Sequence, residues 1–194
     1  MKRLLIILFF FIFSSSLAGE TFPTNREFVG YAVDSLIGQL PVPSEVETLS
    51  IDVQSIYPDI GDMLFTSLCS RLASCGKTVV KGSDNVVTIG LKELLFSYPR
   101  AYCRHIFGQK LLERKVYIRV LYTIESSNSL LRTQEIKSTL TDTIPYSIRS
   151  ELEGEPNSLF TPEVKSFSPS FYYRELFLST TAAILLSTLF FLSK

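Results

Sequence analysis

The side chains best suited to chemistry in this sequence are three cysteines and one histidine, Cys69, Cys75, Cys103 and His105. Cys103 and His105 are two residues apart, so in an extended segment both would point the same way and could form a nucleophile–base pair. The four residues could also ligate zinc, but Cys-x5-Cys followed by Cys-x-His fits no common zinc pattern. We expect neither site: a loop whose Cys and His do not act together is the simpler interpretation.

Acidic residues do not suggest catalysis either. Asp59 and Asp62 are explained by the start of a helix, where carboxylates cap free N–H groups and meet the positive end of the helix dipole. Glu151, Glu153 and Glu155 form a solvated stretch rather than an acid–base pair. A G-x-S-x-G stretch is missing from the sequence, and the glycines are too scattered for a phosphate loop. We therefore predict that the protein is not an enzyme and uses no cofactor or metal.

Basic residues are concentrated in one segment of a chain whose formal net charge is zero. The stretch Tyr98–Arg119 carries six bases and one acid, whereas Glu20–Ser97 has a net charge of −5 and Val120–Ser170 one of −3. Aromatic residues lie among the bases. We predict a partner- or lipid-binding loop here, made of Arg100, Tyr102, Arg104, His105, Phe107, Lys110, Arg114 and Lys115.

Several partners fit this predicted binding loop. Arginine and aromatic side chains suit the core of a protein interface, which favours an acidic patch on a protein partner. Anionic lipid head groups attract basic segments by about 1 kcal/mol per side chain. Nucleic acid is not expected for an exported protein. The simplest alternative is a solvated hairpin tip whose charges prevent aggregation.

The first residues predict export. Lys2 and Arg3 precede the apolar run Leu4–Phe13, and Ser16-Leu17-Ala18 offers the small residues that a signal peptidase reads. This is the pattern of a secretory signal peptide spanning residues 1–18. An uncleaved N-terminal anchor is the alternative.

The last residues predict a membrane anchor. Leu176–Ser193 contains no charged residue, and a transmembrane helix needs about 17–25 such residues. We predict a transmembrane helix at 175–193 and an extended, proline-containing tether at 153–174. A signal for a glycolipid anchor is the rival interpretation. It requires a eukaryotic source, and none of the asparagines after the signal peptide begins an N-x-S/T sequon.

Two helices are predicted in the exported body, residues 19–152. The stretch Arg26–Leu40 has a helical apolar stripe that Pro41 and Pro43 end. In Asp59–Cys75, apolar residues recur along one helical face, with Asp59 as the N-cap and Gly76 as the left-handed residue after the end.

Strands make up the remainder of the body. Val46–Val53 and Lys77–Lys81 are predicted as short strands, and three longer ones follow at Val86–Tyr98, Lys115–Glu125 and Leu130–Thr141. The last is the most polar, so we expect it near an edge of the sheet, where it could pair with a copy of itself or be covered by the first helix. The order predicts an α+β fold, a small mixed or antiparallel sheet with two helices on one face.

The stretches "AVDSLIGQL" and "DIGDMLFTSLCSRLASCGKTVV", followed by paired strands, resemble small periplasmic accessory domains of the FlgO-like, LpoB-like and TolB amino-terminal group. The resemblance covers roughly Arg26–Thr141 and carries over no site residue. It implies an envelope accessory or assembly protein. The lipoprotein cysteine of part of that group is missing here.

These observations together predict a membrane-anchored exported accessory or scaffold protein that binds a protein partner in cell-envelope assembly. It would sit in the inner membrane, with its domain facing the periplasm or the cell exterior. The alternatives are a lipid or small-ligand binding module at the membrane surface, and a thiol-dependent enzyme that uses Cys103. A homo-oligomer is compatible with the sequence.

Overall fold

The computed structural model describes residues 21–44, 46–103, 109–126, 129–154 and 158–163, together with helical residues at 176–177, 179–181, 183–185 and 188. The predicted signal peptide and most of the predicted span at 175–193 lie outside these residues. Within the part of the chain that is described, no helix is long and apolar enough to cross a membrane.

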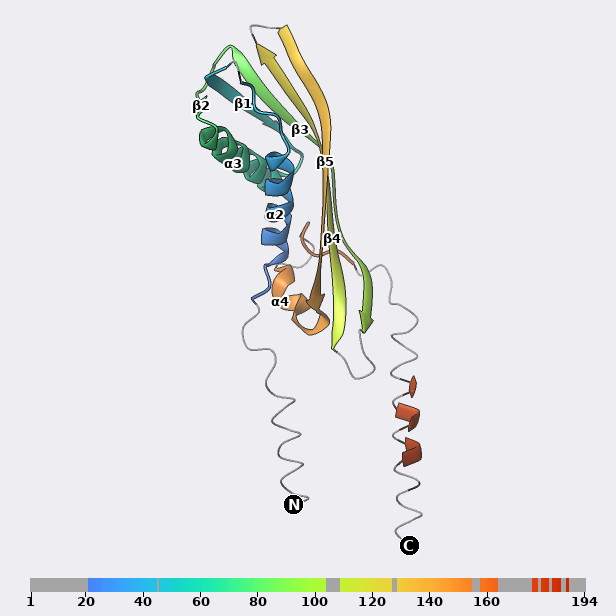
Figure 1. Ribbon diagram of the computed structural model, residues 1–194. Helices are drawn as coiled ribbons and strands as arrows, with labels where there is room; N and C mark the ends of the chain where they lie inside the picture. The colour runs from blue at the N-terminus through green and yellow to red at the C-terminus, as the bar shows by residue number, and fades with distance from the viewer. Residues whose placement is uncertain are drawn as a thin grey trace.

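The fold is mixed α+β, built on a curled five-stranded sheet (Figure 1). The strand order is β2-β1-β3-β4-β5, with β1 at Thr48–Gln54, β2 at Thr78–Val79, β3 at Asn85–Cys103, β4 at Lys110–Ser126 and β5 at Ser129–Pro145. Strand β1 pairs in parallel with β2 and β3, whereas β3, β4 and β5 form an antiparallel meander. The predicted mixed sheet and the edge position of the third long strand are confirmed.

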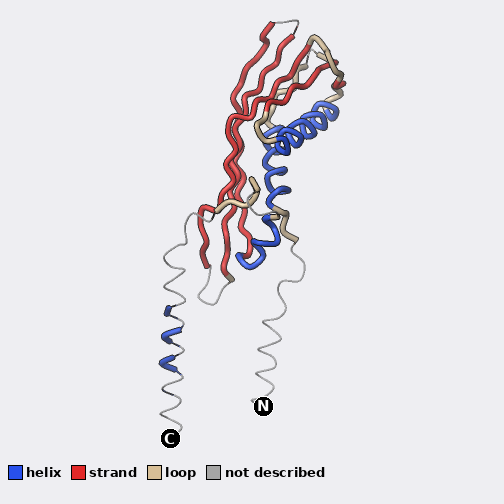
Figure 2. The backbone as a smooth tube through the Cα atoms, turned by 180° about the vertical axis from the view of Figure 1, so that it is seen from behind, coloured by secondary structure: helices blue, strands red, loops and turns tan. Residues whose placement is uncertain are grey.

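Helices α2 (Asn25–Gly38) and α3 (Pro58–Ser74) lie on the same side of the sheet, as predicted (Figure 2). Helix α2 begins with a capping box: the Thr24 hydroxyl accepts a hydrogen bond from the Glu27 N–H, and the Glu27 carboxylate accepts one from the Thr24 N–H. The predicted N-cap of α3 is wrong. Tyr57 holds that position without a side-chain hydrogen bond, and Pro58, preset for the first helical turn, starts the helix one residue before Asp59.

We call β1, β2 and the parts of β3, β4 and β5 that α2 and α3 cover the helix half of the molecule. Its core is apolar. Alternate residues of β4 face the helices and are buried, as its period-2 pattern predicts. In α3 the buried stripe is narrower than expected, because Phe65 remains 44% exposed. The main buried contacts come from Leu36, Leu64, Leu68, Leu72, Ile89, Ile118 and Val120.

The hairpin half comprises residues 96–103 of β3, 110–116 of β4 and 140–145 of β5, which extend beyond α3 (Figure 1). Here the covering layer consists of the chain before α2, the 3-10 turn Tyr146–Ile148, and the short helix α4 (Arg149–Glu153). A second, small apolar cluster forms between these layers. Its buried members are Tyr98, Ala101, Leu112 and Ile144, with Phe22, Phe96, Tyr146 and Leu152 packed against them.

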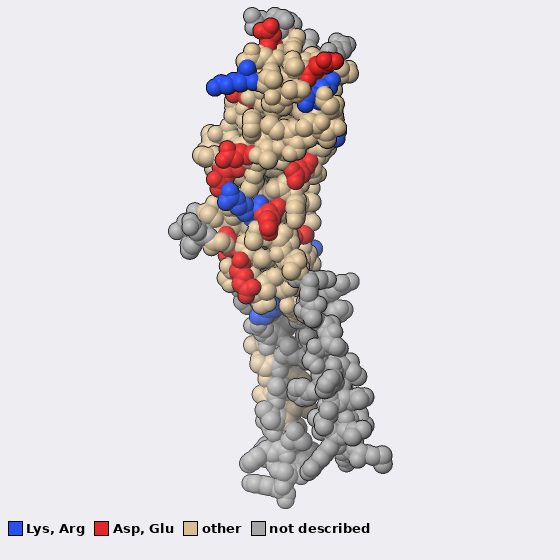
Figure 3. Space-filling view, turned by 90° about the vertical axis from the view of Figure 1, so that its left-hand side faces the viewer, with Lys and Arg blue, Asp and Glu red and all other residues tan. Residues whose placement is uncertain are grey.

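Charge is mixed on the side of the molecule that carries the helices. Acidic side chains are spread along the length of this side, and basic ones lie among them (Figure 3). This distribution gives the helix side no single-sign patch.

Candidate functional site

The segment predicted as a binding loop is mostly strand. Strand β3 continues to Cys103 and β4 starts at Lys110, so the pairing extends almost to the hairpin end. The structure brings Tyr102 opposite Leu111 and Arg100 opposite Glu113. Three of the predicted residues, Arg104, His105 and Phe107, lie outside the described residues.

Arg100 lies on the hairpin surface and already has a charged partner. Its Nε donates to Glu113 Oε2 at 2.7 Å, and its guanidinium lies 4.9 Å from the centre of the Tyr102 ring. The Arg100 side chain is 61% exposed. Such exposed pairs contribute about 0–1 kcal/mol, so Arg100 and Tyr102 remain available to a partner at small cost.

Lys115 lies on the open face of the sheet, the face without helices. It stands opposite Ser97 in the register and helps to line a shallow groove of about 380 Å³. Two register shifts of β3, at Leu91/Glu93 and Ser97/Arg100, flank this groove. Bulges of this kind re-aim side chains on one strand, and Pro99, which lacks an N–H, falls within the second. The groove is lined by Glu93, Leu95, Ser97, Lys115 and Tyr117.

Arg114 is buried, unlike the other described residues of the predicted loop. Its side chain has no exposed surface and forms a two-point ion pair with Asp142, in which Nε donates to Oδ1 at 2.8 Å and the second bond joins Nη2 to Oδ2. Nη1 donates to the carbonyl of Pro23 at 2.9 Å and to Asn25 Oδ1 at 3.0 Å. The guanidinium lies 4.6 Å from the centre of the Phe28 ring. These contacts offset the high cost of burying a charge.

Asn25 links Arg114 to two other parts of the chain. Because a guanidinium only donates, the amide oxygen of Asn25 must face Arg114, and its nitrogen is left to donate. That nitrogen donates to the Tyr98 hydroxyl and to the carbonyl of Phe160, both at 2.7 Å. Asn25 is fully buried. One amide therefore joins the start of α2, strand β3 and residues 158–163.

Arg149 and Glu153 extend these contacts into α4. Arg149 donates to Glu153 Oε1 at 2.5 Å and to the carbonyl of Pro162 at 3.3 Å, and its guanidinium lies 5.1 Å from the centre of the Tyr98 ring. Burial, and to a smaller degree the neighbouring Glu153 carboxylate, raises the pKa of Tyr98 to about 12, against a lowering effect from Asn25. Tyr98 therefore stays a neutral phenol at ordinary pH. We call Arg114, Asp142, Asn25, Tyr98, Arg149 and Glu153 the polar cluster.

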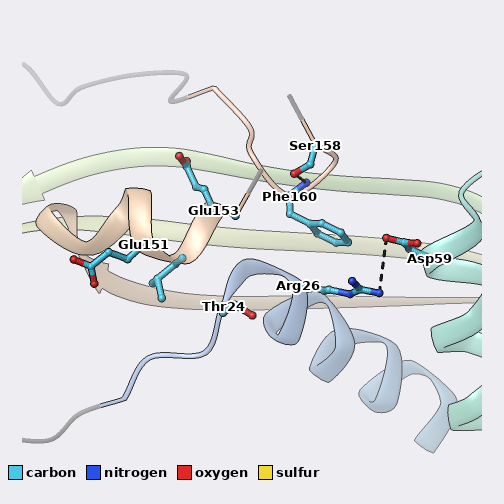
Figure 4. A pocket seen from close by; sticks show the side chains of 9 residues that line it. Thr24, Arg26, Asp59, Glu151, Glu153, Ser158 and Phe160 are labelled. Carbon is cyan, nitrogen blue, oxygen red and sulfur yellow. Dashed lines mark hydrogen bonds and ion pairs between the residues drawn. The ribbon is translucent and has the colours of Figure 1, made fainter. Parts of the chain in front are cut away.

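A pocket of about 400 Å³ opens beside the polar cluster (Figure 4). The Phe160 ring points toward the Arg26–Asp59 ion pair, which is 3.8 Å long and more than half exposed. Glu151 and Glu153 come from α4 on the opposite side. The pocket places one base and three acids around an aromatic ring, and two of the acids are already paired, Asp59 with Arg26 and Glu153 with Arg149.

The cysteines do not come together. None of the three forms a disulfide; Cys75 is exposed, and Cys69 and Cys103 are partly buried. Burial raises the pKa of the Cys69 thiol, which disfavours the reactive thiolate. Among the residues that the structure describes, no three His, Cys, Asp or Glu side chains are grouped so that they could hold a metal ion. His105, which is two residues from Cys103 in the sequence, is outside those residues.

No protein-family model and no curated protein matches this chain. Solved structures that are similar in part include three bacterial lipoproteins. The minor lipoprotein of Acinetobacter baumannii is 17% identical, with 56% of this chain and 71% of that chain covered and a TM-score of 0.34. The rare lipoprotein B of Shewanella oneidensis is 13% identical, with 73% and 92% covered and a TM-score of 0.31. Lipoprotein GNA1162 of Neisseria meningitidis is 11% identical, with 72% and 98% covered and a TM-score of 0.27. Likeness at these scores supports no inference about what this chain binds.

Proposed function

We propose that this protein is an exported, membrane-anchored accessory protein, without catalytic activity, that binds a protein partner in cell-envelope assembly through its hairpin half. One observation carries the proposal. The polar cluster fastens both the residues before α2 and residues 158–163 to the same half of the sheet, beside the β3–β4 hairpin. Residues 21–24 follow the predicted signal peptide, and residues 158–163 precede the predicted transmembrane helix. Both segments therefore lie in the half of the domain that carries the basic residues.

Chain length limits how far that half lies from the membrane. The Pro162 carbonyl is bound by Arg149, and the predicted span starts at 175. Twelve residues extend over at most about 40 Å at 3.3–3.6 Å each. The predicted anchor thus keeps the hairpin half close to the bilayer, which suits a partner that is itself in or near the membrane.

The hairpin offers an interface of suitable chemistry. The exposed Arg100 stacks on the half-buried Tyr102, and arginine and tyrosine are enriched where interfaces are energetically strongest. Lys115 adds a charge from the open face. Since Asp142, which lies outside the basic segment, neutralises Arg114, the net positive charge here is smaller than the sequence indicates. This reduction favours a specific protein contact over general attraction to anionic lipid.

Photo-crosslinking in cells tests the proposal. A photoreactive residue is placed at Tyr102, at Phe107, or at the exposed control Glu125, near the far end of β4. We expect one discrete heavier protein band from Tyr102 and Phe107 and none from Glu125. Equal labelling at all three positions, or no protein adduct at the hairpin, would contradict the proposal.

Binding of lipid is the second candidate, because the same geometry holds the hairpin near the bilayer. Its discriminating result is a lipid adduct at Tyr102 or Phe107 without a protein band. In vesicles of anionic and of neutral lipid, the lipid adduct at Tyr102 should then require negative charge and be weakened in an Arg100→Gln variant. Equal adduct with both lipid types would exclude this candidate.

A further inference from the structure

Strand β5 forms one outer edge of the sheet along seventeen residues. Protein sheets blunt such edges with short strands, prolines, bulges or charged side chains. The opposite edge is short, since β2 has two residues. Strand β5 is long and has no proline and no register shift between Arg132 and Ile144, and its charged residues are of both signs. Its outer row of backbone groups meets no other strand among the described residues.

We propose that β5 pairs antiparallel with β5 of a second copy of this chain, about a two-fold axis at Ile136. The two sheets then become one continuous sheet, with the helices of both copies on the same face. The observation that selects a second copy is the charge pattern of the strand around Ile136. Glu135 and Lys137 flank it, and both are exposed.

The open face of this pairing is self-complementary. With Ile136 on the axis, Glu135 lies opposite Lys137 of the second copy, and Thr133 lies opposite Thr139. Symmetry repeats both pairs. Opposite charges and threonine pairs across strands are each stabilising. Glu135 is available for this contact, because Arg119 holds it at 3.6 Å while already bound to Glu93 at 3.1 Å.

Neighbouring registers are worse. Moving the axis to Glu135 or to Lys137 places that residue opposite its own copy, so like charges meet. An axis midway between two neighbouring residues would place inward-facing residues of one strand opposite outward-facing residues of the other. Because directly opposite residues must point to the same face of a sheet, this register would turn one sheet over. The sequence of β5 therefore selects the axis at Ile136 over its nearest alternatives.

Helix α2 adds a second contact on the covered face. The hydroxyl oxygens of Ser138 and Ser35 lie 3.5 Å apart, so this flank of α2 runs along β5. Tyr31 is one helical turn before Ser35 and is 54% exposed. Since the two-fold axis brings the α2 helices to the same face, Tyr31 of each copy flanks the joint. Exposed tyrosine is typical of such interfaces.

Charge exchange tests the pairing and its register together. We compare the detergent-solubilised full chain with Glu135→Lys, Lys137→Glu and the double variant by sedimentation equilibrium. Each single change creates two like-charge pairs and should weaken dimerisation about tenfold. The double variant restores both pairs with reversed signs and should return to within about threefold of the wild-type dissociation constant.

Lys92→Glu is the matched control, because it changes the net charge as Lys137→Glu does but lies on β3, away from the edge. It should leave dimerisation unchanged. A wild-type chain that is monomeric at micromolar concentrations would overturn the proposal. So would a double variant that dissociates as readily as the two single variants.

Cysteine pairs test the register independently. In a chain whose native cysteines are replaced by alanine, Thr133→Cys/Thr139→Cys should form a disulfide-linked dimer on mild oxidation. Either change alone should not, because in this register each position is six residues, about 20 Å, from its own copy. Dimers that form equally from the single variants would contradict the axis at Ile136.

Discussion

The two halves of the molecule are held together by different physics. The helix half buries aliphatic side chains of α2 and α3 against the sheet, and the buried groups there are almost all apolar. The hairpin half has a small apolar cluster and places a fully buried arginine next to it. Aliphatic packing is non-directional, whereas each bond of the polar cluster requires a partner in one place.

This difference indicates what each half does. An apolar core tolerates many arrangements of similar volume, so the helix half needs its residues chiefly for stability. The polar cluster fixes the segment before α2, strand β5, helix α4 and residues 158–163 relative to one another through named atoms. We infer that the hairpin half is built for positional precision near the predicted anchor.

The largest effect is expected for Arg114→Ala. It leaves Asp142 partly buried without its cation and Asn25 without its donor, which should lower the free energy of unfolding by about 4 kcal/mol. Urea denaturation of the full chain measures it. Arg114→Met combined with Asp142→Leu removes both charges and should recover most of the loss. If the double variant is as unstable as Arg114→Ala, the buried charge is not the cause.

Leu64→Ala makes the corresponding change in the helix half. Leu64 is fully buried in α3, and its removal leaves a cavity that should cost about 3 kcal/mol in the same urea experiment. Leu64→Met, which conserves volume, should cost less than half as much. Similar losses for both substitutions would mean that shape, and not cavity size, dominates this core.

Asn25→Ala should cost about 2 kcal/mol, because it leaves Tyr98 and the Phe160 carbonyl without their donor. Asn25→Asp keeps the contact to Arg114 but turns the donor into an acceptor toward Phe160. The aspartate variant should therefore loosen residues 158–163 while keeping the segment before α2 bound. Limited proteolysis followed by mass spectrometry measures cleavage of the aspartate variant in residues 158–163 and in the segment before α2. Equal cleavage rates in the two segments would contradict the role of the Asn25 amide nitrogen as the donor to Phe160.

Stability should fall above pH 10 in both halves. Burial raises the pKa of Tyr98 and of Tyr122 to about 12, from 10 in the unfolded chain. The unfolded state therefore loses these protons first, so the free energy of unfolding decreases between pH 10 and pH 12, by about 1–2 kcal/mol per tyrosine. Tyr98→Phe and Tyr122→Phe should each remove part of this decrease in the free energy of unfolding with pH. If both variants keep the full wild-type decrease, the raised pKa values are contradicted.

The smallest effect is expected for Glu113→Gln on the hairpin surface. Its bond to Arg100 is exposed and should contribute less than about 1 kcal/mol to stability. The variant should nevertheless change crosslinking from Tyr102, because Arg100 is then free to turn away from that ring. A stability loss as large as that of Asn25→Ala would mean that the Arg100–Glu113 pair stabilises the fold as the polar cluster does, which would contradict this expectation.

The helix half could be predicted from the sequence because its signals are local. Periodicity, the two prolines after the first helix and Gly76 located both helices, and Gly76 does adopt a left-handed φ of 74°. The alternation of β4 located that strand. What the sequence could not show is the length of β3 and β4, because Pro99 and the basic residues read as a loop although the strands pair through them.

Arg114 shows why the polar cluster escaped sequence reasoning. Its position continues the inward series of β4 by one step, since Leu112 and Val116 on either side are buried. The two-residue alternation of β4 places position 114 on the inward face, and this could be seen in the sequence. A charged residue at an inward position, however, is usually taken to mean that the strand has ended. Its partners, Asp142 and Asn25, lie 28 and 89 residues away, and no local pattern identifies contacts at that distance.

Hydrogen exchange tests most directly the central claim, that one buried cluster fastens both flanking segments to the hairpin half. Exchange is followed by mass spectrometry in the full chain for wild type, Arg114→Ala and Leu64→Ala. We predict that Arg114→Ala raises exchange in residues 21–25 and 158–163 together, while Leu64→Ala leaves both protected and affects α3. Exchange that rises in only one of the two segments, or equally in both variants, would contradict the claim.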